Sequence, residues 1–249
     1  MKPFKLTVAP NGARLQKSDH PALPISIAEI VACARDCFVA GADEIHLHVR
    51  HSDGCHSLDA GQYSEALTEL ALVVPEMSVQ ITTESAGVFD VDAQLACLQS
   101  LKPSAASISV REMARNADLA KRVYGLCADV GTNVQHILYS PECVTQLLKW
   151  RADGTILAAQ KDAIFVLGHY NPPVLATPSH LDVFLNAIDG HDITWSACAF
   201  GLNEHACLSR AIQMGGHARI GFENNHQSAD GKIFADNSAS ITAFLAQQG

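Results

Sequence analysis

The feature that most constrains this chain is a repeated alternation of short apolar, β-rich runs with longer segments of helical periodicity. Eight runs have strand length and end at turn residues: 4–10, 44–50, 78–85, 105–111, 133–140, 164–169, 192–201 and 218–224. Helix-like segments follow them at 26–42, 59–73, 91–101, 115–129, 142–149, 179–188, 204–214 and 237–246. Eight strand–helix repeats in 249 residues predict an α/β fold, a single-domain (β/α)8 TIM barrel over residues 1–249.

The main alternative is a doubly wound open sheet that binds a dinucleotide. That fold needs fewer strands and a Gly-rich phosphate turn after the first one. The residues after the first strand read "APNGAR", which is not GxGxxG. The sequence therefore favours the barrel.

Composition excludes several classes of function. The chain has 26 acidic and 17 basic residues, a balance that argues against a general nucleic-acid or anionic-membrane binder. We find no signal-peptide pattern at the N-terminus and no apolar stretch near the roughly 18 residues that span a bilayer. The eight cysteines include no CxxC pair, so we expect reduced thiols and a cytoplasmic protein.

Two histidines lie one residue apart in the apolar run "EIHLHVRHSDG". Side chains two apart point to the same face of a strand, so His46 and His48 should converge on one point. Two imidazoles and a carboxylate form a common catalytic Zn²⁺ site, and Fe²⁺ or Mn²⁺ accepts the same ligands. In a closed barrel the last strand flanks the first, which flanks the second, and Glu223 at the end of the last strand can supply the carboxylate. The competing interpretation is a pair of hydrogen-bonded core histidines.

Other polar residues also gather at the expected strand ends, where barrel enzymes place their functional groups. Arg219 precedes Glu223 by four residues and either orients that carboxylate, binds an anionic substrate or forms a structural ion pair. His136 and His169 are more typical of structural positions than of ligands. The candidates for substrate binding are Asn11, Thr83, Ser107, Ser109 and Trp195, and hydroxyls among them can equally fill a tapering barrel.

Four motifs together resemble a known family. "HLHVR", "QITT", "WS" and "GGHARIGFENN…DGK" are similar to the β-keto acid cleavage enzymes, and the resemblance runs over nearly the whole chain. It implies a zinc-dependent barrel that condenses a small β-keto acid with acetyl-CoA to give acetoacetate and a new acyl-CoA. It also implies a homo-oligomer, by resemblance a tetramer, with no nucleic-acid or membrane partner.

The resemblance assigns roles to individual residues. His46, His48 and Glu223 correspond to the zinc ligands. Arg219 and Thr82 correspond to a catalytic network beside them. The family places an aspartate directly after the ligating glutamate as general base, but this chain has Asn224 there, an amide that takes up no proton at neutral pH.

The base is therefore open at this point. His136, Glu84 or a hydroxide on the metal are the alternatives, and Glu84 stands where the family more usually has glycine. Two other functions compete. An amidohydrolase-type hydrolase would recruit His136 and His169 to a second metal, although such enzymes place HxH on the first strand. The second competing function is a metal- or CoA-binding protein without catalytic activity. Asn224, at the family's base position, supports this alternative.

Overall fold

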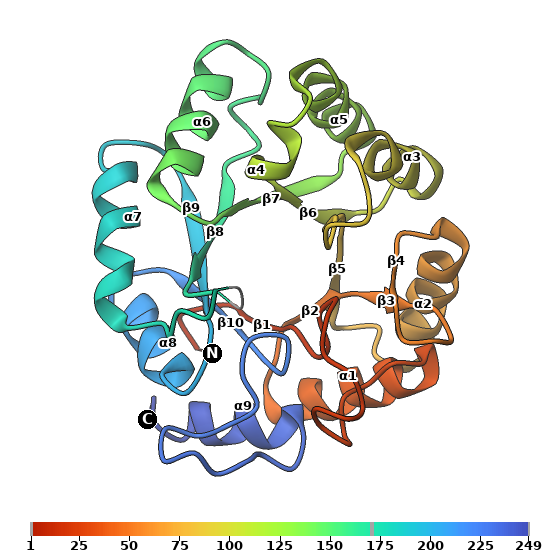
Figure 1. The fold of residues 1–249 in the computed structure, drawn as a ribbon, viewed down its shortest axis with the longest axis vertical. Coiled ribbons are helices and arrows are strands. Elements are labelled where there is room, and N and C mark those ends of the chain that lie inside the picture. The colour runs from red at the N-terminus through yellow and green to blue at the C-terminus, as the bar shows by residue number, and fades with distance from the viewer. Residues whose placement is uncertain (1, 170–171, 249) are drawn as a thin grey trace.

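The computed structural model describes residues 2–169 and 172–248 and forms one closed barrel (Figure 1). Eight parallel strands close it in the order β1-β10-β9-β8-β7-β6-β5-β2. The strands are β1 (Leu6–Val8), β2 (Glu44–Leu47), β5 (Ser78–Thr82), β6 (Ala105–Ser109), β7 (Asn133–Leu138), β8 (Asp162–Leu167), β9 (Thr194–Ala199) and β10 (His217–Ile220). The predicted TIM barrel is confirmed.

Helices form a ring outside the strands, and the first and last of them, α1 and α9, pack against each other (Figure 1). The helices that follow the barrel strands are α1 (Ile27–Ala40), α2 (Ala60–Val73), α3 (Val91–Leu101), α5 (Ala117–Val130), α6 (Pro141–Ala152), α7 (Leu181–Ile188), α8 (Glu204–Gln213) and α9 (Asn237–Leu245). A 3-10 turn, η1 (Pro178–His180), precedes α7. Each helix lies within a few residues of its predicted position.

The start and end of α1 show why the local sequence forms a helix there. The Ser26 side chain accepts from the Glu29 N–H and the Glu29 carboxylate accepts from the Ser26 N–H, which completes a capping box. Gly41 ends the helix at φ 112°, a left-handed conformation that glycine adopts without strain.

The strands end two to four residues before their predicted ends, and at three of them the local cause is visible. Residues 110–113 form a short helix, α4 (Val110–Met113), because the Ser109 hydroxyl accepts the Glu112 N–H and starts a helical turn. β3 (Val49–Arg50) leaves the barrel and pairs with β4 (His56–Ser57) in a small antiparallel hairpin. β10 ends at Ile220, because Gly221 has φ 139° and a Cβ there would lie 2.5 Å from the Ala9 carbonyl oxygen.

Arg50 ties the loop after β1 to this hairpin. Its buried guanidinium donates to the carbonyl oxygens of Gly12, Gly54, Asn11 and Leu15. One side chain thus holds the loop at the mouth of the barrel. The helices in the described ranges lack the combined length and apolar character needed to cross a membrane.

Candidate active site

A cavity of about 670 Å³ opens at the carboxyl ends of the strands, where barrel enzymes carry their active sites. Its wall combines residues from the loop after β1, from β2 and from the segments after β5, β6, β7, β8 and β10. The polar and charged side chains that line it are Asn11, Arg14, His46, Thr82, Glu84, Arg111, Glu112, Tyr139, Ser140, His169, Arg219 and Glu223.

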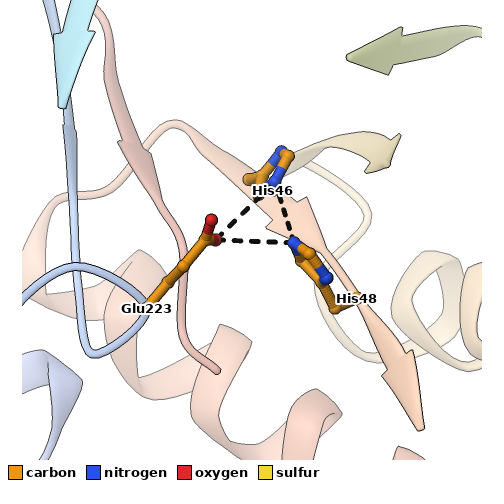
Figure 2. Close-up of side chains that lie close together, drawn as sticks. All are labelled: His46, His48 and Glu223. Carbon is orange, nitrogen blue, oxygen red and sulfur yellow. Dashed lines mark hydrogen bonds and ion pairs between the residues drawn. The ribbon is translucent and has the colours of Figure 1, made fainter. Parts of the chain in front are cut away.

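His46, His48 and Glu223 come together, as the sequence predicts (Figure 2), and His46 and Glu223 line this cavity. The two Nε2 atoms lie 3.2 Å apart. Glu223 Oε2 lies 3.7 Å from His46 Nε2 and 3.5 Å from His48 Nε2. An ion that holds tetrahedral ligands at about 2.1 Å separates them by about 3.4 Å. The spacing of the three atoms therefore fits one divalent cation.

The charge states of His46 and Glu223 also fit a cation. Burial, followed by the charge of Arg219, lowers the pKa of His46 to about 3, so its imidazole is neutral. Burial raises the pKa of Glu223, but the charge of Arg219 is the strongest opposing influence, and the pKa lies well below its usual value. A neutral imidazole and an ionised carboxylate are the forms that bind metals.

Gln80 on β5 orients the first histidine. Its Oε1 atom accepts the Nδ1–H of His46 at 2.9 Å, and the two residues are register partners in the β2–β5 pairing. With the proton on Nδ1, the lone pair of Nε2 points toward Glu223 and His48. Gln80 lies in the motif "QITT", but its role cannot be read from the sequence, because it depends on the register to the neighbouring strand.

Arg219 holds the carboxylate from the other side. Its Nη2 atom lies 3.2 Å from Glu223 Oε1 and 3.3 Å from Cys198 Sγ, and all three side chains are buried. Because β10 ends at Ile220, Arg219 and Glu223 form this pair across a turn. Arg219 thus occupies one oxygen of the carboxylate and leaves the other facing the histidines.

The turn that carries Glu223 is fixed by two further residues that the sequence analysis did not single out. Glu204 at the start of α8 is fully buried and accepts from the Gly221 N–H at 3.1 Å and from Asn225 Nδ2 at 3.3 Å. The Asn237 side chain accepts the Phe222 N–H at 2.9 Å. These contacts set the direction from which Glu223 enters the cavity.

The predicted hydroxyl residues separate into two groups. Thr82 lines the cavity, and its Oγ1 atom accepts from Ser107 Oγ at 3.3 Å and from the Glu84 N–H at 3.1 Å. Thr83 instead donates to the Ser107 carbonyl, and Ser109 caps α4. The structure places Thr82 at the site, with Ser107 behind it, whereas Thr83 and Ser109 are engaged with the main chain.

Three predicted residues lie outside the group of possible metal-ligand atoms. Trp195 stacks on Phe165 with ring centroids 5.3 Å apart and covers Gly216, so it packs outside the strands. His136 is fully buried against Tyr124, with Nε2 on the Gln160 carbonyl. His169 lines the cavity wall but is outside the group of metal-ligand atoms formed by the described residues. The described residues therefore give no support to a second metal held by these histidines.

Asn11 and Asn224 have different surroundings. Asn11 lines the cavity, and its Nδ2 donates to the carbonyls of Pro24 and His48. Asn224 follows the metal-ligand glutamate directly, but it lines a second, smaller cavity of about 350 Å³.

Comparisons with known proteins agree with this geometry. A family model described as beta-keto acid cleavage enzyme matches residues 3–247. A 3-keto-5-aminohexanoate cleavage enzyme from Fusobacterium nucleatum subsp. nucleatum is 28% identical over 239 residues, covering 90% of this chain and 84% of that relative. A 3-oxoadipate:acetyl-CoA acetyltransferase from Cupriavidus necator is 25% identical over 261 residues, covering 98% and 88%.

Solved structures show the same fold. A ternary complex of ObcA with a C4-CoA adduct and oxalate has a TM-score of 0.69 at 15% identity and matches 91% of this chain. This chain covers 64% of the length of that ObcA chain, which is less than two thirds. A type I 3-dehydroquinate dehydratase from Clostridium difficile has a TM-score of 0.63 at 13% identity, covering 99% of this chain and 93% of its own. The family match over nearly all of the sequence decides the identity: this chain belongs to the beta-keto acid cleavage enzyme family, whose members act on β-keto acids.

Proposed function

We propose that the protein is a zinc-dependent enzyme that exchanges acyl groups between a 3-oxo acid and acetyl-CoA. The acetyl group of the thioester joins the carbon between the two carbonyls of the acid, and the original acyl group leaves on CoA. The products are acetoacetate and a new acyl-CoA. The observation that carries this proposal is the buried group of two imidazoles and one carboxylate, two of whose members line a cavity, in a chain of this family.

His46, His48 and Glu223 would hold the cation, and Fe²⁺ or Mn²⁺ would fit the same donors. The bound cation supplies Lewis-acid polarisation of the substrate's oxygen atoms. The protein's own contribution is to present these donors in the correct state. Gln80 keeps the His46 proton on Nδ1, and Arg219 keeps Glu223 ionised and fixed.

The cavity wall suits an anionic substrate. Arg111 lies with its guanidinium carbon 4.0 Å from the centroid of the Tyr139 ring, and both residues line the cavity. Thr82 and Asn11 add hydroxyl and amide groups nearby. A 3-oxo acid would find a cation for its carboxylate and polar groups to orient it.

A carboxylate must still accept the proton from the carbon between the two carbonyls, and Glu84 is our candidate. Glu84 Oε2 lies 4.0 Å from His48 Nε2, and burial raises the pKa of this side chain, which favours proton uptake. Glu112 is the competing carboxylate in the wall, but Ser85 and Gln94 engage both of its oxygens. His136 is buried away from the cavity.

The decisive experiment incubates the metal-loaded protein with acetyl-CoA and a pool of short 3-oxo acids and identifies acyl-CoA products by mass spectrometry. His46→Ala and Glu223→Gln should lose bound metal and product together, whereas the exposed His191→Ala should keep both. Glu84→Gln should keep the metal but lose both product and deuterium exchange at the acidic carbon. Absence of any acyl-CoA with every acid tested would contradict the proposal.

A catalytically altered binding protein is the second candidate, because the family's aspartate position holds Asn224. An inert wild type that gains activity through Asn224→Asp would support it. From the family resemblance we also propose that the protein is a cytoplasmic homo-oligomer, most simply a tetramer. The free state of all eight cysteines supports a reducing compartment, and light scattering in solution tests the oligomeric state.

A further inference from the structure

A second cavity of about 350 Å³ adjoins the first. Leu15, His169 and Phe200 line both cavities, so these residues form a shared wall between them. Apolar side chains form most of its wall, among them Pro173, Val174, Leu175 and Phe222. No Lys, Arg, Asp or Glu is among the described residues that line it. The cavity therefore suits a neutral, largely apolar ligand.

Polar residues also line this cavity, and they are His169, Asn224, Asn225, His226 and Gln227. Among the described lining residues, only Asn224 has buried side-chain polar atoms without a hydrogen-bond partner. Its side chain is 3% exposed, and neither Oδ1 nor Nδ2 has a hydrogen-bond partner among the described residues. Its main chain is fixed, because its N–H donates to Gly221 and its carbonyl accepts from Gly201. The amide is thus held at the cavity with one donor group and one acceptor unsatisfied.

The neighbouring asparagine shows that this is not a general property of the turn. Asn225 donates through Nδ2 to Glu204 and to the Gln227 carbonyl, and its Oδ1 accepts the Gln227 N–H. A buried amide without partners costs about 1–3 kcal/mol, and such groups are rare in folded proteins. The unpaired Asn224 amide therefore points to a ligand that completes it.

The chemistry of the amide limits what this ligand is. A side-chain amide presents one acceptor and a donor group side by side, and its natural complement is another amide. A carboxylate is a poor match, because it lacks a donor and the described residues of the wall include no Lys or Arg. The acyl end of acetyl-CoA is joined to its phosphates by a neutral alkyl arm with two amide groups, which has the required composition.

We propose that the second cavity receives the amide-bearing arm of the acyl-CoA and that Asn224 forms hydrogen bonds with one of its amides. This inference rests on the proposed acyl exchange with acetyl-CoA. The arm would place the thioester at the shared wall between the two cavities, beside the metal-ligand group. Asn224 is then a binding residue for the thioester, whereas its neighbour Glu223 faces the substrate acid.

The test compares the wild type with Asn224→Leu, which has nearly the same volume but no polar atoms. One pair of substrates is S-acetyl-N-acetylcysteamine, which carries one amide, and S-pentyl thioacetate, which carries none. The wild type should prefer the amide thioester by about tenfold in kcat/KM, and Asn224→Leu should lose this preference. The KM of the 3-oxo acid should stay unchanged, and Asn186→Leu on an exposed face of α7 should behave as wild type.

Binding of CoA and of pantetheine by calorimetry gives a second readout that needs no turnover. Asn224→Leu should weaken both about tenfold, while its melting temperature without ligand stays equal or rises because an unpaired amide is removed. If the role of Asn224 were only structural, Asn224→Leu would have a lower melting temperature and an unchanged affinity for CoA. That result would overturn the inference. A shift confined to the KM of the 3-oxo acid would also overturn it.

The two proposals fail in different ways. If the wild type forms no acyl-CoA from any acid but binds CoA in a manner sensitive to Asn224→Leu, the acyl exchange is wrong and the binding site stands. If acyl-CoA forms and the variant binds and selects thioesters as the wild type does, the exchange stands and the inference is wrong.

Discussion

His46 donates its Nδ1 proton to Gln80 Oε1 at 2.9 Å, so the orientation of one histidine of the proposed metal site depends on a neutral residue of the neighbouring strand. The contact joins β2 to β5 at a register position of the barrel. It selects the tautomer whose Nε2 lone pair faces Glu223. Gln80 therefore holds the His46 ring in the orientation that the proposed metal site requires.

Removing that support should weaken metal binding without removing a ligand. We expect Gln80→Leu to lower zinc affinity about 10- to 100-fold, because the ring can then rotate and exchange tautomers. Competition with a coloured chelator measures this affinity. Gln135→Leu, which changes a buried barrel glutamine bonded to Ser196, is the matched control and should keep the wild-type affinity. Equal affinities for the two variants would contradict the role of Gln80.

Two adjacent threonines should separate catalytic from structural hydroxyls. Thr82→Val removes a hydroxyl that lines the cavity, and we expect kcat/KM to fall about 10- to 100-fold. Thr83→Val removes a donor to the Ser107 carbonyl and should act mainly on stability, by about 1–2 kcal/mol. Steady-state kinetics and urea unfolding of both variants distinguish these effects. A larger kinetic loss in Thr83→Val would restore it as a substrate-binding residue.

Trp195 was expected to bind substrate, and its position outside the strands predicts a different result. Trp195→Phe should lower the free energy of unfolding by about 1–2 kcal/mol, because the smaller ring leaves space against Gly216 and Phe165. The KM values for both substrates should stay at the wild-type level. An increase of either KM at unchanged stability would favour the original expectation.

Arg50 offers a test of the loop at the cavity mouth. We expect Arg50→Lys to lower the free energy of unfolding by about 2–4 kcal/mol, because one ammonium group cannot reach the four carbonyls that the guanidinium serves. The exposed Arg35→Lys is the control for loss of a guanidinium alone. Chemical denaturation measures both. If the two variants had closely similar denaturation midpoints, the planar guanidinium of Arg50 would not be needed to hold the loop.

His136 should contribute to acid sensitivity. Burial lowers its pKa to about 4 from the ordinary 6.5, so the unfolded chain binds a proton that the folded chain excludes. Its stabilising effect is present above pH 6.5 and is lost as the pH falls toward 4, up to about 3 kcal/mol. Between pH 7 and pH 4, the free energy of unfolding of His136→Gln should therefore fall less steeply than that of the wild type or of His191→Gln. Parallel curves would contradict this assignment.

Local sequence was a good guide to the elements and to two of the three residues of the possible metal site. Strand and helix periodicity depend on neighbours within a few residues, and side chains two apart share a strand face, so His46 and His48 were predictable as a pair. Their partner Glu223 was reached by assuming barrel closure, and the family resemblance supported it.

The rest depended on contacts between distant segments. Gln80 and Glu204 look like ordinary polar residues in the sequence, and only strand register and helix docking bring them to the site. The sequence does not decide which face of its strand Trp195 occupies. A residue in a strand faces either the barrel interior or the helices, and a shift of one residue moves its side chain from one face to the other.

By itself, the sequence determined that eight strand–helix units form and that two imidazoles converge, because both follow from local backbone geometry. Only the tertiary structure decided that Glu223 and Asn224, adjacent in the chain, face different cavities. The physical reason is the turn after Gly221, whose direction is set by hydrogen bonds to Glu204 and Asn237 on two distant helices.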